Sequence, residues 1–153
     1  MGVKNEMNPS IAFKKIWEDE DMVELIISIC DGKSLFQCDV YVGNQTMAET
    51  IDDLNVFKDQ VCGGLYDLRY GEFGPEYASG ALHARFEFHR SGNGKLSITV
   101  KAESEWNDFT HTKVASNANL YLRTEPGLFD NWLIELKELK TGASDEAILE
   151  CIQ

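Results

Sequence analysis

The chain has 153 residues, with fourteen Lys and Arg against twenty-six Asp and Glu, for a formal net charge of −12. This length suits one domain that spans residues 1–153 and needs no disulfides, and 43% hydrophobic residues argue against a disordered acidic tail. The charge argues against non-specific binding to nucleic acid or to an anionic membrane, because their phosphates would be repelled.

The first part of the chain predicts three strands. Residues 11–17 alternate between apolar and polar side chains, and residues 23–29 do so with a clear period of two. Asp31-Gly32-Lys33 is typical of a hairpin turn, and it leads into a return strand over residues 34–42. These strands are expected to pair antiparallel, each with one buried face.

The period then changes to that of a helix. Thr46 and Glu49 have the spacing of a capping box, and Gly63-Gly64 predicts the end of the helix. The apolar stripe that this helix would bury consists of Met47, Ile51, Leu54, Phe57 and Val61.

The middle of the chain predicts a loop and a hairpin. Residues 65–79 start as a short strand and continue as a loop rich in Gly, Pro and aromatic residues. Residues 82–88 alternate strictly, Ser91-Gly92-Asn93-Gly94 forms the turn, and residues 96–102 alternate again.

The last part predicts a strand and a second helix. A polar connection over residues 106–111 leads to a strand that ends at residues 119–123. Thr124-Glu125-Pro126-Gly127 marks a helix start, because proline is tolerated in the first turn. Leucines and aromatic residues then form a stripe up to Lys140, and the tail over residues 141–153 predicts one weak helical turn.

Together these elements predict an α+β fold in two layers. Hairpin connections imply a mainly antiparallel sheet of about six strands, and two amphipathic helices suffice to cover one of its faces. The core is expected over about residues 10–140, followed by the C-terminal tail. The open face of the sheet would carry Tyr41, His83, Arg85, Glu87, His89, Lys101, Tyr121 and Arg123.

Motifs for catalysis and for metal binding are not found in the sequence. His83 and His89 share a strand face but stand about 20 Å apart, too far to hold one ion. No serine or cysteine lies in a nucleophile motif, and neither glycine-rich turn opens a helix that could bind phosphate. We therefore expect a protein that is not an enzyme, with no catalytic residues, no metal and no cofactor.

Cysteine spacing and the N-terminus predict a cytoplasmic protein. The four cysteines form no C-x-x-C pair and sit in apolar stretches, as is typical of reduced, buried thiols. Residues 1–10 contain no apolar leader, and the longest apolar run is far too short to span a membrane.

Charge and aromatic residues point to a protein partner. Residues 18–59 hold eleven acids and two bases, and such a field would steer a basic partner, although solubility alone would also explain it. Two loops add aromatic anchors, unless these fold back onto the sheet edges. The candidate partner-binding residues are Glu18, Asp19, Glu20, Asp21, Tyr70, Glu72, Phe73, Glu76, Tyr77, Trp106, Asp108 and Phe109.

Two alternatives remain open. The open sheet face around Tyr41, His83, Arg85, Glu87, His89, Tyr121 and Arg123 could bind a small molecule or carry an enzymatic site. The chain could instead be a subunit of a small homo-oligomer that uses exposed strand edges or the tail. Both differ from the first hypothesis, in which the chain is a monomer that binds one protein partner.

Several segments resemble those of a known group of proteins. These are Phe36 to Val42, the helix that follows, the hairpin from Phe86 to Val100, and Leu120 to Phe129, whose Thr-Glu-Pro-Gly-Leu helix start is the most specific part. Over roughly residues 20–140 the chain resembles small cytoplasmic bacterial immunity proteins of polymorphic and contact-dependent toxin systems. The resemblance implies a non-enzymatic protein that binds and blocks one cognate toxin, often a nuclease with a basic groove. It assigns no individual binding residue.

Overall fold

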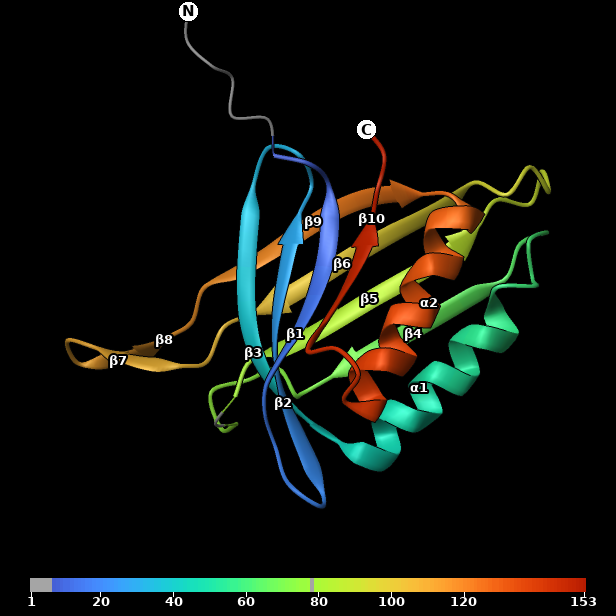
Figure 1. The fold of residues 1–153 in the computed structure, drawn as a ribbon. Coiled ribbons are helices and arrows are strands. Elements are labelled where there is room, and N and C mark those ends of the chain that lie inside the picture. The colour runs from blue at the N-terminus through green and yellow to red at the C-terminus, as the bar shows by residue number, and fades with distance from the viewer. Residues whose placement is uncertain (1–6, 78) are drawn as a thin grey trace, which may run out of the picture.

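Two four-stranded antiparallel sheets, a small hairpin and two helices make up the fold (Figure 1). A computed structural model describes residues 7–77 and 79–153, and these counts refer to that part of the chain. The N-terminal residues 1–6, over most of the stretch where the sequence predicts no leader, lie outside the described residues.

Sheet A contains the first three strands and the last one. Its order is β10-β1-β2-β3, with every neighbouring pair antiparallel. The strands are β1 (Ser10–Glu18), β2 (Met22–Cys30), β3 (Leu35–Gly43) and β10 (Glu146–Glu150). The predicted alternation holds: Val23, Leu25, Ile27 and Ile29 are buried, and the residues between them are less buried.

Sheet B contains the middle strands in the order β4-β5-β6-β9. The strands are β4 (Leu65–Tyr70), β5 (Ala81–Phe88), β6 (Leu96–Glu103) and β9 (Asn117–Thr124). The connection between β6 and β9 forms a separate hairpin of β7 (Asn107–Phe109) and β8 (Thr112–Val114), which projects from the body of the protein (Figure 1).

The helices close the space between the two sheets. In Figure 1 the strands of sheet A run steeply across those of sheet B, and α1 (Asn44–Phe57) and α2 (Pro126–Thr141) lie side by side at the open side. Their apolar stripes are buried as predicted, including Met47, Ile51, Leu54 and Phe57 of α1.

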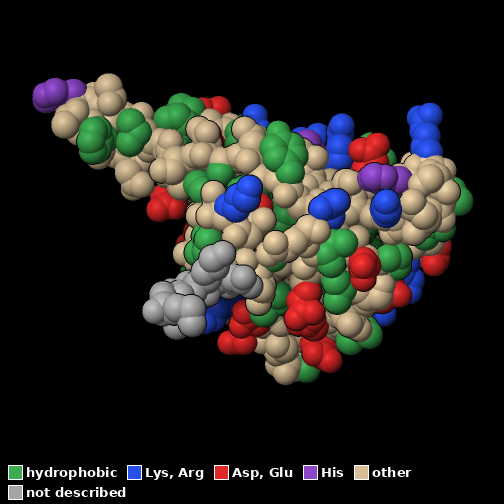
Figure 2. Space-filling view, turned by 90° about the horizontal axis from the view of Figure 1, so that it is seen from above, with side chains coloured by type: hydrophobic (Ala, Val, Ile, Leu, Met, Phe, Trp, Pro, Cys, Tyr) green, Lys and Arg blue, Asp and Glu red, His purple; other side chains and the backbone are tan. Residues whose placement is uncertain are grey.

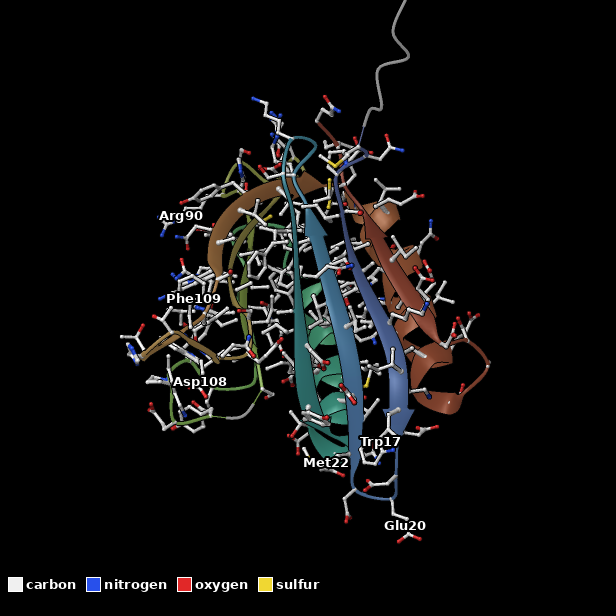
Figure 3. All side chains as sticks on the ribbon, turned by 90° about the vertical axis from the view of Figure 1, so that its left-hand side faces the viewer. Trp17, Glu20, Met22, Arg90, Asp108 and Phe109 are labelled. Atoms are coloured by element: carbon white, nitrogen blue, oxygen red, sulfur yellow. The ribbon has the colours of Figure 1, made fainter. Side chains whose placement is uncertain are left out.

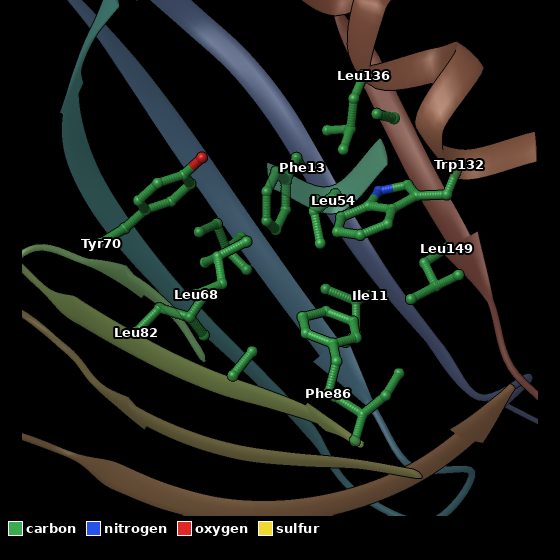
Figure 4. Packing of buried hydrophobic residues seen from close by; sticks show 14 of the residues in the cluster. Ile11, Phe13, Leu54, Leu68, Tyr70, Leu82, Phe86, Trp132, Leu136 and Leu149 are labelled. Carbon is green, nitrogen blue, oxygen red and sulfur yellow. The ribbon is translucent and has the colours of Figure 1, made fainter. Parts of the chain in front are cut away.

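Trp132 of α2 joins all parts of the core (Figure 4). Its ring stacks on Phe86 of β5 at 5.8 Å and meets Phe13 of β1 edge-on at 5.6 Å, so it contacts both sheets. Full burial of each such ring stabilises the fold by about 1.5–3 kcal/mol, with about 0.5–1.5 kcal/mol more for each aromatic pair.

The prediction of one sheet of about six strands is wrong in its arrangement. The fold is α+β with two helices and antiparallel strands, but the strands divide into two sheets whose inner faces share one core. Strand periodicity shows which face of a strand is buried, and it cannot show which sheet the strand joins.

Three local predictions are also wrong. The capping box does not form, because α1 already begins at Asn44 after Gly43 and has no side-chain cap; Asn44 instead donates to the carbonyls of Asp19 and Glu20 at 3.1 and 3.0 Å. The helix ends at Phe57, six residues before Gly63. The tail forms β10 rather than a helical turn, and it pairs with β1 at the edge of sheet A.

Candidate functional site

The outer face of sheet A carries an exposed aromatic pair beside two carboxyl groups. Across β1, β2 and β3, the register places Trp17 opposite Glu24 and Glu24 opposite Tyr41. Asp39 stands on β3 two residues before Tyr41, so it faces the same way. We call Trp17, Glu24, Asp39 and Tyr41 the sheet A site.

Asp39 has an unusual environment within this site. One of its carboxylate oxygens, Oδ1, is buried and finds no hydrogen-bond partner among the described residues. Burial raises the pKa of Asp39 to about 7, and the nearby Glu24 carboxyl adds to the rise by hydrogen bonding and by its charge, as does the charge of Glu105. Near neutral pH the Asp39 carboxyl group therefore carries a proton part of the time.

The aromatic pair borders these carboxyl groups. Trp17 is 46% exposed and Tyr41 is 44% exposed. Hydrogen bonding of the Tyr41 hydroxyl to Glu24 raises the pKa of Tyr41, with smaller contributions from burial and nearby negative charge. The site thus combines negative charge with two flat apolar surfaces, a combination suited to a guanidinium or ammonium group.

The predicted acidic turn lies at the end of the same sheet (Figure 3). Asp19 accepts hydrogen bonds from the backbone amides of Asp21 and Met22, both at 2.8 Å, and these bonds lower the pKa of Asp19. Glu18 pairs with Lys15 at 3.3 Å. Glu20 and Asp21 are exposed and form no ion pair within the described part of the chain.

The two predicted aromatic loops are joined through Glu103 of β6. Its Oε2 accepts from the backbone amide of Gly74 at 3.0 Å and from the Trp106 indole at 3.2 Å. Phe73 and Trp106 are half-buried, and the Lys101 ammonium lies 5.2 Å from the centre of the Phe73 ring. These two aromatic residues therefore face back onto sheet B in part.

The remaining predicted partner-binding residues divide into two groups. Tyr70 is buried at 3% exposure and contacts Phe13 with ring centres 6.1 Å apart, so it belongs to the core. Five are exposed on loop 71–80 and on the β7–β8 hairpin: Glu72, Glu76, Tyr77, Asp108 and Phe109. Figure 3 shows Asp108 and Phe109 on the hairpin, well apart from Glu20 at the end of sheet A.

The predicted open face belongs mostly to sheet B. His83, Arg85, Glu87, Lys101, Tyr121 and Arg123 project from its outer side, with His89 just beyond β5. Tyr41 does not join them, because it lies on sheet A. The single open face predicted from the sequence is therefore two separate faces.

Asp67, on the edge strand β4, binds two basic side chains of β5 on the outer face of sheet B. Its Oδ1 lies 2.8 Å from His83 Nε2 and 2.9 Å from Arg85 Nε, and its Oδ2 accepts from Arg85 at 3.2 Å. Hydrogen bonding from Arg85, and next from His83, lowers the pKa of Asp67 to about 2 in spite of partial burial. A second pair, His89 Nε2 and Ser97 Oγ, stands 2.9 Å apart.

The four cysteines are free, and they differ in burial. Burial raises the pKa values of Cys38 and Cys151 to about 12, which makes these two thiols poor nucleophiles. Cys62 is exposed, so the prediction of buried thiols is wrong for this residue. Within residues 7–77 and 79–153, no three His, Cys, Asp or Glu side chains are grouped to hold a metal ion. In the same part of the chain, no helix is long and apolar enough to cross a membrane.

The sheet A site itself was not predicted as a unit. The alternation predicted over residues 23–29 and the strand predicted over residues 34–42 put Glu24 and Asp39 on outward positions, but nothing in the sequence marks them as neighbours. The sequence feature that could have shown them as neighbours is the hairpin turn at residues 31–33. This turn fixes the register that brings Ile26 opposite Asp39 and Glu24 opposite Tyr41. Trp17 lies opposite Glu24 because the register of β1 shifts between Lys15 and Trp17. No motif in the sequence marks this shift.

Comparison of the chain with protein-family models, with curated proteins and with solved structures finds no match in any of the three. We therefore infer a function from the geometry of the two sheet faces.

Proposed function

We propose that this protein is a non-enzymatic binding module that masks a basic surface of a protein partner, in the concrete form of an immunity protein against a toxin. The observation that carries the proposal is the burial of Asp39 Oδ1, an oxygen that finds no hydrogen-bond donor among the described residues. A carboxyl group in this state lowers the stability of the folded chain above neutral pH, because its charged form is partly buried and lies near the negative charges of Glu24 and Glu105. Such a cost is typical of residues kept for function.

A basic side chain of a partner would supply a positive charge beside the carboxyl groups of Asp39 and Glu24. An arginine placed over the sheet A site could donate to the carboxylates of Asp39 and Glu24 and lie against the rings of Trp17 and Tyr41. Aromatic and charged residues that are buried together on binding are typical of the few positions that dominate the binding energy.

The charge around the site supports the same kind of partner. Eleven acids and two bases fall in residues 18–59, which include the sheet A site except Trp17. This field would accelerate association with a basic protein and make the rate depend on salt. The resemblance to immunity proteins of toxin systems agrees, since it implies a partner with a basic groove.

Capture followed by growth rescue tests the proposal. The immobilised protein is exposed to a lysate of the cells it comes from, and bound protein is eluted with increasing salt. We expect one basic protein in stoichiometric amount. That protein, expressed alone, should arrest growth, and co-expression of this chain should restore it. A captured partner that is harmless to cells would refute the toxin part and leave the binding module in place.

A second candidate function is ligand binding on the open face of sheet B. The cluster of His83, Asp67 and Arg85 favours it, because three polar groups converge there on an exposed surface. Titration of the ¹⁵N-labelled protein with small carboxylates and phosphates tests it. Shifts confined to β4, β5 and β6 would support this function, and shifts spread over the whole chain would count against it.

A further inference from the structure

The open face of sheet B is basic, although the chain as a whole is acidic. Of the fourteen Lys and Arg residues, six project from this face or from the β5–β6 turn beside it, together with three of the twenty-six acids. The six bases are Arg69, Arg85, Arg90, Lys95, Lys101 and Arg123. In Figure 2 most of the visible Lys and Arg side chains lie toward the upper side of the protein, and most carboxylates lie toward the lower side, with some of each kind among the other.

The register aligns two of these bases with a histidine in one row. Arg69 of β4 lies opposite His83 of β5, and His83 lies opposite Lys101 of β6. Basic residues directly opposite one another destabilise a sheet once they are charged. Arg69, Lys101 and Arg123 form no ion pair with any described residue, so their charge is not neutralised within this chain.

The chain also carries an acidic element that is separate from this face. The β1–β2 turn contains Glu18, Asp19, Glu20 and Asp21 in succession, and it forms the far end of sheet A (Figure 3). The backbone bonds to Asp19 and the Asn44 side chain hold the turn in shape. Glu20 and Asp21 are exposed there without an ion-pair partner among the described residues.

We propose that two copies of this chain associate head to tail, with the acidic β1–β2 turn of one copy on the basic row of sheet B of the next. A second copy is the occupant that the charges favour, because the same chain carries both complementary surfaces. A nucleic acid fits less well, because its phosphates follow one another along the whole strand, and Asp67, Glu87 and Glu103 interrupt the basic face with negative charge.

This contact joins two different surfaces, so it is not a two-fold dimer. Each copy that binds through its turn leaves its own basic face free for another copy. Heterologous contacts of this kind close into a ring or continue as an open chain. Association should therefore grow with concentration, and it should weaken when salt screens the charges.

Sedimentation velocity with reciprocal charge reversal tests the proposal. The face variant is Arg69→Glu with Lys101→Glu, and the turn variant is Glu20→Lys with Asp21→Lys; all four side chains are exposed. The control variant is Asp130→Lys with Glu138→Lys on α2, which changes the net charge as the turn variant does. Circular dichroism establishes that each variant is folded before it is used.

In low salt the wild type and the control should sediment faster as their concentration rises. Each reversed variant alone should associate about 100-fold more weakly, because like charges then face each other. A mixture of the two reversed variants should associate again, since the turn of one now complements the face of the other. About 1 M salt, where the Debye length is about 3 Å, should abolish association in every sample.

Three results would each overturn the proposal: a wild type that stays monomeric at every concentration in low salt, reversed variants that associate like the wild type, or a mixture that does not associate. The experiment uses this chain alone, so its outcome is independent of the proposed toxin partner.

Discussion

The Trp17 indole meets the Tyr41 ring edge-on on the outer face of sheet A, with ring centres 6.4 Å apart and an interplanar angle of 71°. About half of each side chain is exposed, and Glu24 lies between them in the register. Two large rings that bury only half of their surface contribute less to stability than core aromatics do. They remain free for contact with a partner.

Replacement of Trp17 by alanine should separate binding from stability. We expect a loss of about 1 kcal/mol or less in the free energy of unfolding, because Trp17 is half exposed. The affinity for the captured partner should fall by at least about tenfold, as for an aromatic anchor. Denaturant unfolding and calorimetric titration measure the two quantities. Val56→Ala on the exposed side of α1 is the control, and it should change neither.

Replacement of Asp39 by asparagine should stabilise the protein at alkaline pH. The pKa of Asp39 is about 7 in the folded protein and about 3.9 in an unfolded chain. Between these values the folded state binds more protons, so its stability falls as the pH rises from about 4 to about 7. Asp39→Asn has no carboxyl group at this position, so its stability does not fall for this reason over that pH range. We expect a gain of about 1 kcal/mol at pH 8, after allowance for solvent screening, and no gain from this effect near pH 4.

Denaturant unfolding of the wild type and of Asp39→Asn at several pH values measures this effect. The exposed Asp52 on α1 offers a matched control, and Asp52→Asn should show no such dependence on pH. A difference between wild type and Asp39→Asn that is the same at pH 4 and pH 8 would contradict the raised pKa of Asp39.

Binding of the basic partner should release that proton. A cation placed over Asp39 favours its charged form, so the affinity should rise as the pH increases from about 6 to about 8. Calorimetry in buffers of different ionisation enthalpy counts the protons released. Asp39→Asn should abolish the release, and release that persists in this variant would place the titrating group elsewhere.

Two substitutions of Trp132 should differ in cost. The Trp132 indole nitrogen is buried and finds no acceptor among the described residues. Phenylalanine therefore loses no hydrogen bond, and we expect it to cost about 1–2 kcal/mol in unfolding free energy, against about 3–5 kcal/mol for alanine, which leaves a cavity between the two sheets. Equal costs would show that Trp132 does not join the sheets as described.

The last strand offers a neighbouring pair of residues for comparison. Leu149 is fully buried in the shared core, and Ile148 points to the other side of sheet A and is only partly buried. Leu149→Ala should lower the unfolding free energy by about 2–4 kcal/mol, and Ile148→Ala should cost about 1 kcal/mol or less. Similar costs for both would contradict the pairing of β10 with β1.

Local patterns in the sequence predicted the elements well and their assembly poorly. The alternation over residues 82–88 and the stripe of Met47, Ile51 and Leu54 follow from burial of one face, a property that each element shows by itself. The division into two sheets depends on which strands meet, and only tertiary contacts decide that. The tail was predicted as a helical turn because its pairing partner, β1, lies about 130 residues away in the sequence.

The candidate site could be predicted only in part for the same reason. The acidic bias of residues 18–59 and the exposure of Glu20, Asp21 and Phe109 could be predicted from composition and turn positions. The buried oxygen of Asp39 could not, because its environment combines Glu24 of another strand with Glu105 from a distant connection. Tyr70 was assigned to a partner surface because the period of β4 over residues 65–70 was too short to show which side is buried.

The affinity of the captured basic partner for three forms of this chain tests the central claim most directly. The forms are the wild type, Glu24→Gln with Asp39→Asn in the sheet A site, and Arg69→Glu with Lys101→Glu on sheet B. We predict that the sheet A variant binds at least about 100-fold more weakly, and that the sheet B variant stays within about threefold of the wild type. Undiminished binding by the sheet A variant, or loss of binding only in the sheet B variant, would contradict the account.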